Sequence, residues 1–454
     1  MSKITMALLI LFIFINTISS EKIVDIPFKL YSTAQFFPNP NDPVIKRCMT
    51  QLVVEVLIGT PAQKMNSTLN LMTYHSFFLA HKIGNVSIPK FYNKSSSSYE
   101  CLKNYSEYEN EDFSYAEIFN DDIQIFSSDK ENIIDDGFNF FLVDKLGENI
   151  PNEFYASLII GLKIKSHNKK IHYPKDLNFI YQLKNKGLID NCIFTFEFNE
   201  KNGKRNESLT AEEEEEENYE KDYEGHFIIG RDIYNDNNYV RLTIQNTLWS
   251  LNFYKIYYGN IEFESQEQAL IETEYGLTVG TINYEEIMKE FFNKQKNCYM
   301  NKIKMGYETY NYYYCDEDFD ENKIDNLTFV FNLQRTDINF TFTGKELFFS
   351  EGGKKYFNII FFTYPSYIWY FGREFLKKNQ LYFDLERKII YVKYDNKYNL
   401  LKKPYFWIII IILIISIRYI IYYAFCSKKA KRTKKVNELE EDDKLIEKKQ
   451  LEDI

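Results

Sequence analysis

The 454-residue chain is poor in the residues and motifs on which many enzymes depend. It has five histidines, no H-x-x-x-H pair for a zinc site, no G-x-S-x-G nucleophile turn and no Walker-type glycine loop. It also lacks an excess of basic residues. The formal net charge is -10, whereas a nucleic-acid-binding surface needs a basic face. We therefore expect no metal, no cofactor and no nucleic-acid partner.

Aromatic residues, in contrast, are abundant. The chain has 39 Phe and 37 Tyr, a composition that favours strands over long surface helices. Short β-branched and aromatic runs dominate between Ile23 and Tyr394, and a helical pattern appears in few places, such as DLNFIYQLKNKGLI and YEEIMKEFFNKQ. The chain is too long for one average core. The sequence thus predicts an all-β fold with two lobes or domains.

Long apolar runs lie only near the two ends of the chain. The first follows a positive start and ends in small residues, which predicts a signal peptide over residues 1–20 rather than a membrane anchor. The second, residues 404–425, can span a bilayer if Arg418 snorkels to the interface. Six basic residues follow it and predict a cytoplasmic tail, 426–454. We expect a single-pass type I membrane protein of the secretory or endolysosomal system or the cell surface.

Cysteines and glycosylation sequons suit a lumenal or extracellular region. Five cysteines precede the predicted span, an odd number that leaves one free or paired between chains. Cys426 borders the membrane on the cytosolic side, either as a palmitoylation site or without a role. The same region contains seven N-x-S/T sequons, which begin at Asn66, Asn85, Asn93, Asn104, Asn206, Asn326 and Asn339.

An acidic segment divides the β region. Residues 199–224 include the run Glu212–Glu217, which cannot be buried and predicts a solvated loop insertion. It separates an N-terminal lobe, 21–198, from a C-terminal lobe, 225–396.

The segment VEVLIGTPAQ followed by KMNSTLNLMTYHS resembles the first active-site segment of pepsin-like aspartic proteases. That family has a strand, I-G-T-P-x-Q, and then D-T-G. The resemblance continues in order through SLIIGLKIKS, FIYQLKNKGLIDNCIFTFEFN, EGHFIIGRDIYN, QALIETEYGLTVGT and IWYFGREFLKKNQLYFDLERKIIYVKY. It covers about Thr50 to Tyr394 and implies a bilobal pepsin-like fold, followed here by the C-terminal transmembrane helix.

The resemblance places Asn70 and Glu272 at the two catalytic aspartate positions. The family mechanism needs two carboxylates that share one proton around a water. An amide can hydrogen-bond that water but cannot take its proton, and the extra methylene of Glu272 displaces its carboxyl group. No Asp-Thr-Gly or Asp-Ser-Gly occurs anywhere in the chain. The resemblance therefore implies lost chemistry.

The turns around these positions also depart from the family pattern. Leu71 replaces the first of two threonines that lock the turns together, while Thr273 keeps the second. Met72 and Glu274 replace the two glycines and add side chains to the binding cleft. Arg373 stands where the family usually has an aspartate. The family flap is a hairpin that contains glycine and a tyrosine, but no glycine lies between Asn85 and Asp136 here. Tyr108 is the candidate for the flap tyrosine, and Tyr115 is the alternative. His75 is expected to pack at the rim rather than to act as a base.

The family disulfide of the C-terminal lobe implies a bond between Cys298 and Cys315. We expect a second bond between Cys48 and Cys101, which leaves Cys192 as a buried thiol.

Three functions fit the sequence. The first is a membrane-anchored pseudoprotease that binds an extended peptide or protein segment without cutting it. The second is a weakly active aspartic-type endopeptidase that uses Glu272, and the third is a surface adhesion or structural protein without a working cleft. In the tail, Glu441, Leu445 and Ile446 resemble an acidic dileucine signal read by clathrin adaptors, although the pair can also occur by chance.

Overall fold

The computed structural model of the protein describes residues 22–74, 76–79, 82–83, 86–87, 96–97, 100–105, 113–126, 132–146, 158–164, 178–199, 224–234, 239–244, 248–265, 267–306, 308–333, 336–393, 411–419 and 421–422. The described chain is mostly β with few short helices, which confirms the predicted fold class at this level. Its contacts group residues 1–394 into one compact unit and residues 395–454 into a second. We call residues 22–234 the N-terminal half and residues 239–393 the C-terminal half of the first unit.

The strands of the N-terminal half are β1 (Val24–Ser32), β2 (Thr50–Ile58), β3 (Gln63–Asn70), β4 (Phe77–Leu79), β5 (Lys82–Ile83), β6 (Val86–Ser87), β7 (Glu100–Tyr105), β8 (Phe113–Phe126), β9 (Asn132–Leu146), β10 (Leu158–Gly161), β11 (Ile193–Phe198) and β12 (Gly225–Ile229). Those of the C-terminal half are β13 (Tyr239–Thr243), β14 (Ser250–Asn252), β15 (Lys255–Tyr258), β16 (Ile261–Ser265), β17 (Gln268–Ile271), β18 (Thr278–Gly280), β19 (Cys298–Met305), β20 (Glu308–Asp316), β21 (Leu327–Leu333), β22 (Thr336–Phe342), β23 (Phe348–Glu351), β24 (Lys354–Phe357), β25 (Ile359–Phe362), β26 (Trp369–Phe371), β27 (Leu381–Asp384) and β28 (Ile389–Lys393). The helices are η1 (Ala34–Phe36), α2 (Pro43–Cys48), α3 (Phe179–Asn185), α5 (Ile282–Asn293), η3 (Glu321–Lys323), η4 (Gly344–Leu347) and α6 (Arg373–Lys378).

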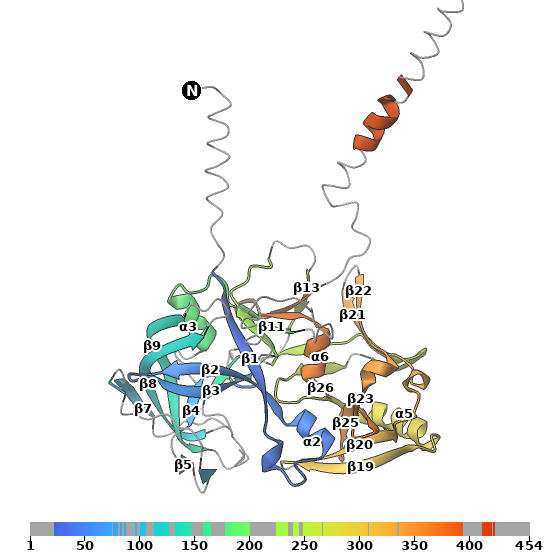
Figure 1. The fold of residues 1–454 in the computed structure, drawn as a ribbon, viewed down its shortest axis with the longest axis horizontal. Coiled ribbons are helices and arrows are strands. Elements are labelled where there is room, and N and C mark those ends of the chain that lie inside the picture. Colours follow the sequence, from blue (N-terminus) through green and yellow to red (C-terminus); the bar gives the residue numbers. More distant parts are fainter. Residues whose placement is uncertain are drawn as a thin grey trace, which may run out of the picture. The chain divides into compact units, whose positions relative to one another are not determined.

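Each half contains the same four-stranded arrangement. In the N-terminal half β3 pairs parallel with β10, β10 pairs antiparallel with β4, and β4 pairs parallel with β9. In the C-terminal half β17, β26, β18 and β25 pair in the same order and in the same directions. Figure 1 shows the two sets on opposite sides of β1 and α2. The pairing is therefore an internal structural duplication.

A shared stretch of sheet joins the two halves. The 13-stranded sheet contains the order β13-β28-β27-β11-β12-β1, with three strands from each half. β11 and β27 pair at its centre, and each begins a few residues after a short helix, α3 or α6. The duplication thus extends through this stretch as well, because β1, β12 and β11 mirror β13, β28 and β27.

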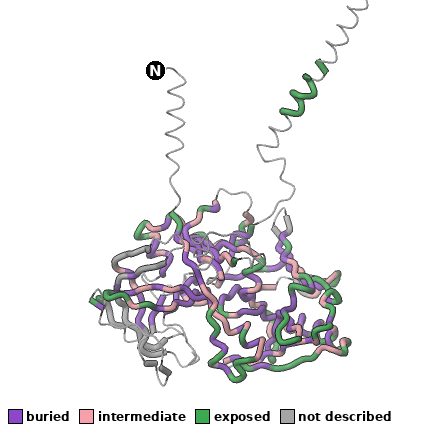
Figure 2. The backbone as a smooth tube through the Cα atoms, in the orientation of Figure 1, coloured by how far each residue is buried: buried purple, intermediate pink, exposed green. Residues whose placement is uncertain are grey.

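The core runs through both halves without a break. Phe194 of β11 stacks on Phe383 of β27 with ring centroids 4.9 Å apart. The buried Trp249 donates from Nε1 to the carbonyl of Leu162, 2.7 Å away in the other half. Every residue of β10, β25 and β27 is buried, and Figure 2 shows that exposed positions gather in the connecting turns. Burial of this apolar surface is the main favourable term for folding.

Cysteine pairing agrees with the sequence in one place and differs in another. The expected disulfide between Cys298 and Cys315 is present, because the β19–β20 hairpin places the two residues directly opposite each other. The predicted bond between Cys48 and Cys101 is wrong: Cys48 is a buried free thiol. α2 carries Cys48 into a cluster with Leu277, whereas Cys101 lies in β7, the edge strand of the 13-stranded sheet. Cys192 is a buried free thiol, as expected.

The second unit is described only in part. Residues 411–419 and 421–422 are helical. In the part of the chain that the structure describes, no helix is long and apolar enough to cross a membrane. The predicted signal peptide, the acidic segment between 200 and 223, most of the predicted span 404–425 and the predicted tail lie outside the described residues.

Candidate functional site

Asn70 and Glu272 occupy equivalent places in the duplicated strands. Asn70 is the last residue of β3, and Glu272 follows directly after β17. In each half a parallel partner strand secures this point: the backbone N–H of Leu162 donates to the Asn70 carbonyl at 2.8 Å, and that of Glu272 donates to the Phe371 carbonyl at 2.9 Å. Both side chains are buried, with 4% and 5% exposure.

The Asn70 amide is fixed on both of its polar ends. Its Oδ1 accepts from the backbone N–H groups of Met72 at 2.7 Å and Thr73 at 2.9 Å. Its Nδ2 donates to the Glu274 carboxylate of the other half. These contacts determine which end of the amide is the oxygen and which is the nitrogen. The nitrogen faces the C-terminal half, where it donates to Glu274.

A second bond joins the two turns through their backbones. The hydroxyl of the buried Thr273 donates to the carbonyl of Leu69 at 2.7 Å. In the N-terminal turn the corresponding position is Leu71, which is fully buried and cannot make the reciprocal bond. Of these two positions, only the C-terminal one therefore donates a side-chain hydrogen bond to the other turn. The N-terminal turn has an apolar leucine at the corresponding position.

Glu272 is an acid held in its neutral form. Burial, and secondly the nearby Glu274 carboxylate, raise the pKa of Glu272 to about 8. Its carboxyl group has no hydrogen bond from any described residue. Since the pKa exceeds 7, most Glu272 side chains are protonated at neutral pH. The site therefore contains an amide, a neutral acid and the exposed carboxylate of Glu274.

Tyrosines surround the acid. Tyr275 shares a 3.2 Å hydrogen bond with Tyr310, and burial raises the pKa of both hydroxyl groups. The Glu272 carboxyl also contributes to the raised pKa of Tyr370, after burial. These phenols stay neutral at any physiological pH, so they add no charge to the surroundings of Glu272.

The segment between β1 and β2 holds the second turn in place. α2 begins after Asp42, whose carboxylate accepts from Val44 N–H, and Pro43 suits its first position. At its other end, the Cys48 carbonyl accepts from Gly276 N–H at 3.1 Å. A Cβ on Gly276 would lie 1.7 Å from the Arg47 carbonyl, so only glycine fits this approach.

Arg373 adds a buried cation next to this contact. It begins α6, and its Nη2 donates to the Arg47 carbonyl at 2.9 Å. Burial lowers its pKa to about 10, so it remains charged at neutral pH. The charge lies where the resemblance leads one to expect an aspartate.

The structure brings together Asn70, Met72, Thr273 and Glu274, all of which the sequence singles out. The sequence did not indicate that Glu274 binds Asn70, or that α2 packs against Gly276. The first contact joins residues about 200 positions apart, so no local pattern indicates it. The second involves α2, a helix of six residues that is too short to show a periodic pattern. In the described residues no group of three His, Cys, Asp or Glu side chains could hold a metal ion.

Other predicted residues lie apart from this site or beyond the described chain. Among the sequons Asn326 and Asn339 are exposed, Asn66 lies half-buried in β3, and Asn104 lies in β7. Tyr115 lies in β8. Outside the described residues are Asn85, Asn93 and Asn206, the flap candidate Tyr108, His75, and the tail residues Glu441, Leu445 and Ile446.

A scan against protein-family models gives no match to this chain, and a search of curated proteins finds no similar sequence.

Proposed function

We propose that the protein is a membrane-anchored homologue of pepsin-like aspartic peptidases that binds an extended peptide or protein segment between its two halves without cutting it. The single observation that carries this proposal is the duplicated strand arrangement with Asn70 and Glu272 at its two equivalent ends. In the family that the sequence resembles, two such ends supply the catalytic aspartates. The hydroxyl of Thr273 on the Leu69 carbonyl supports the same assignment, since the family joins its two turns through threonines.

The absence of cutting follows from the protonation states. A general base must accept a proton from water at the working pH. The Asn70 amide cannot do so, and the raised pKa of Glu272 keeps this carboxyl protonated below about pH 8. Peptide binding does not depend on either ionisation, because an extended ligand is held mainly by main-chain hydrogen bonds.

One observation favours weak peptidase activity as a second candidate. Glu274 brings a carboxylate to the Asn70 amide, and its charge contributes to the raised pKa of Glu272. A neutral acid beside a carboxylate is the arrangement that a shared-proton pair requires. In that case Glu274 would be the base and Glu272 the acid. The exposure of Glu274 weakens this candidate, because water screens and solvates the carboxylate.

The third candidate, a surface adhesion or structural protein, would need the pocket side chains to fill the space between the turns. Met72 is only half-buried, Tyr74 is buried, and Glu274 is exposed. This distribution gives no specific support for a filled cleft.

The proposed location rests on the sequence. A signal peptide over 1–20, one span over 404–425 and a basic tail would place residues 21–403 on the lumenal or outer side, held by one membrane helix. Glu441, Leu445 and Ile446 would then direct the protein to endosomes through a clathrin adaptor. The proposed endosomal location can be checked by comparing where the wild type and a Leu445→Ala, Ile446→Ala double variant are found in the cell. The two proteins should differ in location if the tail carries the signal.

The binding proposal can be tested by hydrogen exchange on the full-length protein in detergent, with and without a mixture of unstructured decapeptides at pH 5 and pH 7. We expect slower exchange in the turns Leu71–Tyr74 and Thr273–Gly276. Protection only on the outer strands, or none with any peptide, would contradict the proposal.

A further inference from the structure

The outer strand of the disulfide hairpin, β19, has a free edge. All eight of its residues, Cys298–Met305, pair with β20, and no other strand in the described part of the chain pairs with it. Figure 1 shows β19 along the outer margin of the C-terminal half, with β20 beside it. A strand with an unpaired edge can accept a further strand through its outward N–H and C=O groups.

The register shows which backbone groups of β19 point outward. In an antiparallel pair, hydrogen-bonded residue pairs have Cα atoms about 5.5 Å apart and alternate with non-hydrogen-bonded pairs at about 4.5 Å. Cys298 and Cys315 face each other at 4.0 Å, so they form a non-hydrogen-bonded pair. The pair before them is bonded, since the Asp316 N–H donates to the Asn297 carbonyl at 2.9 Å. Every second residue from Cys298 onward therefore directs its N–H and C=O groups away from β20.

Three exposed residues of β19 follow this alternation: Met300, Lys302 and Lys304. Their side chains share one face of the strand, and Met300 is 49% exposed. One outward group has a local partner, because the Lys302 N–H donates to the Oδ1 of the neighbouring Asn301 at 2.8 Å. Asn301 is itself exposed, so an added strand can displace this bond and replace it with a main-chain bond. The Cys298–Cys315 disulfide already holds the hairpin, which lowers the cost of ordering this edge on binding.

The free edge carries positive charge that no nearby acid neutralises. Lys302 and Lys304 form no ion pair with any residue that the structure describes. No Asp or Glu occurs between Glu290 and Glu308 in the sequence. On the same face, Glu285 of α5 accepts from Asn311, the residue opposite Lys302, at 2.7 Å. The two lysines are therefore available to carboxylates of a partner.

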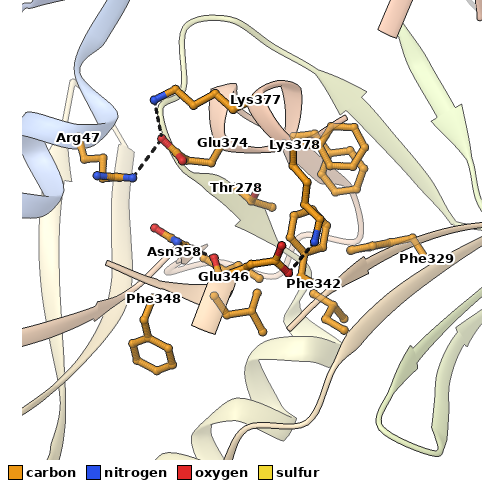
Figure 3. Close-up of a pocket in the computed structure, with 15 residues that line it drawn as sticks. Arg47, Thr278, Phe329, Phe342, Glu346, Phe348, Asn358, Glu374, Lys377 and Lys378 are labelled. Carbon is orange, nitrogen blue, oxygen red and sulfur yellow. Dashed lines mark hydrogen bonds and ion pairs between the residues drawn. The ribbon is translucent and has the colours of Figure 1, made fainter. Parts of the chain in front are cut away.

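Cations at a cavity in the same half are different, because they are already paired. The cavity has a volume of about 420 Å³ and lies beside α6 (Figure 3). On its rim Lys378 pairs with Glu346 at 2.6 Å. Arg47 and Lys377 both approach Glu374, at 3.2 Å and 3.5 Å. The free charge of this half thus lies on the β19 edge rather than at the cavity.

The lysines also limit which strand can be added to β19. A second copy of β19 would bring lysines close to lysines, and like charges across a strand pair are destabilising. Lysines on edge strands commonly prevent self-association in this way. A strand with carboxylates at the matching positions has the opposite effect and gains cross-strand ion pairs.

We propose that the free edge of β19 binds an extended acidic segment of a partner protein as an added antiparallel strand. Antiparallel pairing is the slightly more stable arrangement. Two carboxylates of the segment would lie opposite Lys304 and Lys302, and an apolar side chain would lie opposite Met300. The segment therefore has the pattern acid-x-acid-x-apolar. The main chain of its acidic residues bonds to β19, because the residues opposite an outward N–H and C=O form the hydrogen-bonded pairs.

The test is fluorescence anisotropy of the labelled peptide acetyl-Thr-Glu-Thr-Glu-Thr-Val-Thr-amide, titrated with the full-length protein in detergent at low salt. The matched neutral peptide has glutamine in place of both glutamates. We expect the neutral peptide to bind about tenfold more weakly than the acidic one. Equal binding of the two peptides, or no binding of either up to about 1 mM protein, would overturn the proposal.

Backbone methylation separates strand addition from simple charge attraction. In the proposed pairing the N–H groups of the two glutamates face β19, whereas those of the intervening threonines face away. N-methylation of both glutamates should weaken binding about tenfold or more. N-methylation of the two threonines that follow them is the control and should weaken it about twofold at most. Equal losses from the two modifications would contradict an added strand.

Hydrogen exchange shows where the acidic peptide binds. We expect slower exchange within Cys298–Met305 and no change in the turns Leu71–Tyr74 and Thr273–Gly276. Protection of those turns instead would mean that the peptide occupies the proposed cleft between the halves. That result would overturn the assignment of the β19 edge and leave the proposed function standing.

A double variant, Lys302→Gln with Lys304→Gln, tests the charge on the edge. It should weaken binding of the acidic peptide about tenfold and leave the neutral peptide unchanged. The thermal midpoint should stay the same, because both lysines are exposed and unpaired in the described chain. Lys294→Gln with Lys296→Gln is the matched control, since it removes the same charge just before β19 and should change binding about twofold at most. Equal effects of the two double variants would contradict the roles of Lys302 and Lys304.

Discussion

Asn70 is held by three hydrogen bonds, and its side chain is an amide that cannot serve as a base. Two backbone N–H groups occupy its oxygen, and its nitrogen donates to Glu274 across the halves. An aspartate in the same place would bring a charge close to Glu274. The amide instead gives the Glu274 carboxylate an uncharged donor across the two halves, and Glu272 is buried and mostly protonated at neutral pH.

The Glu272→Gln variant should remove a pH dependence of stability. The folded pKa of Glu272, about 8, is higher than its ordinary value of 4.5, so the folded state holds this proton more tightly than the unfolded state. The stability that it contributes is fully present below pH 4.5 and is lost as pH rises through 8. Glutamine mimics the neutral acid, so at pH 7 the variant should be more stable by about 3 kcal/mol.

Urea unfolding of wild type and Glu272→Gln at pH 5 and pH 7.5 measures this difference. The two proteins should nearly coincide at pH 5 and separate at pH 7.5. A constant difference between them at both values would show that Glu272 does not titrate in this window.

The Thr273→Val variant should weaken the connection between the turns. It keeps the shape of the side chain but leaves the Leu69 carbonyl without its donor. We expect a loss of about 1–2 kcal/mol in the free energy of unfolding. Thr309→Val, at a half-buried position of β20, is the control and should change stability by less than about 0.5 kcal/mol.

At the scale of elements, α2 matters more than its six residues suggest. It lies between β1 and β2 of the N-terminal half, yet its end packs on the turn that follows Glu274. The cluster around it combines Val44, Ile45 and Cys48 with residues of β18, β20 and β25. This helix therefore links the first half of the chain to the second turn of the site.

The Gly276→Ala variant should break that contact. The new methyl group would meet the Arg47 carbonyl, which is backbone and cannot move without shifting α2. We expect a loss of about 3 kcal/mol or more, measured by thermal unfolding. Gly352→Ala is the control: it has open space but a positive φ of 60°, so it should cost only about 1 kcal/mol. A similar small effect of both variants would show that α2 does not constrain the turn.

The free thiols give a further test of the packing. Cys48 and Cys192 are buried, and burial raises the pKa of each to about 12. Because the thiolate is the reactive form, both should resist iodoacetamide in the folded protein and react quickly in denaturant. Mass spectrometry of alkylated peptides can follow each thiol separately. A Cys48–Cys101 bridged peptide under non-reducing conditions would contradict the structure.

The sequence predicts some of these elements well and misses others for physical reasons. Strand-rich composition and the helical patterns within residues 176–189 and 284–295 correspond to the observed strands, α3 and α5. Motif order locates Asn70 and Glu272 at equivalent strand ends. The bond between Asn70 and Glu274 could not be predicted, since it depends on how two distant turns face each other. The Cys48 pairing fails because a six-residue helix without periodicity redirects the chain.

For the whole molecule, the duplication explains why one site can involve residues some 200 positions apart. Each half provides one strand end, and the shared stretch of sheet, with β11 paired to β27, fixes the halves through backbone hydrogen bonds. Under the proposed function this frame serves binding, and the two equivalent strand ends carry an amide and an acid rather than a pair of carboxylates.

The most direct measurement is an endopeptidase assay of the purified full-length protein against a decapeptide library, read by mass spectrometry from pH 3 to pH 8. We predict no cleavage above background at any pH, for the wild type and for Glu272→Gln and Glu274→Gln alike. Cleavage by the wild type that both substitutions abolish would contradict this account and would establish Glu272 and Glu274 as an acid–base pair.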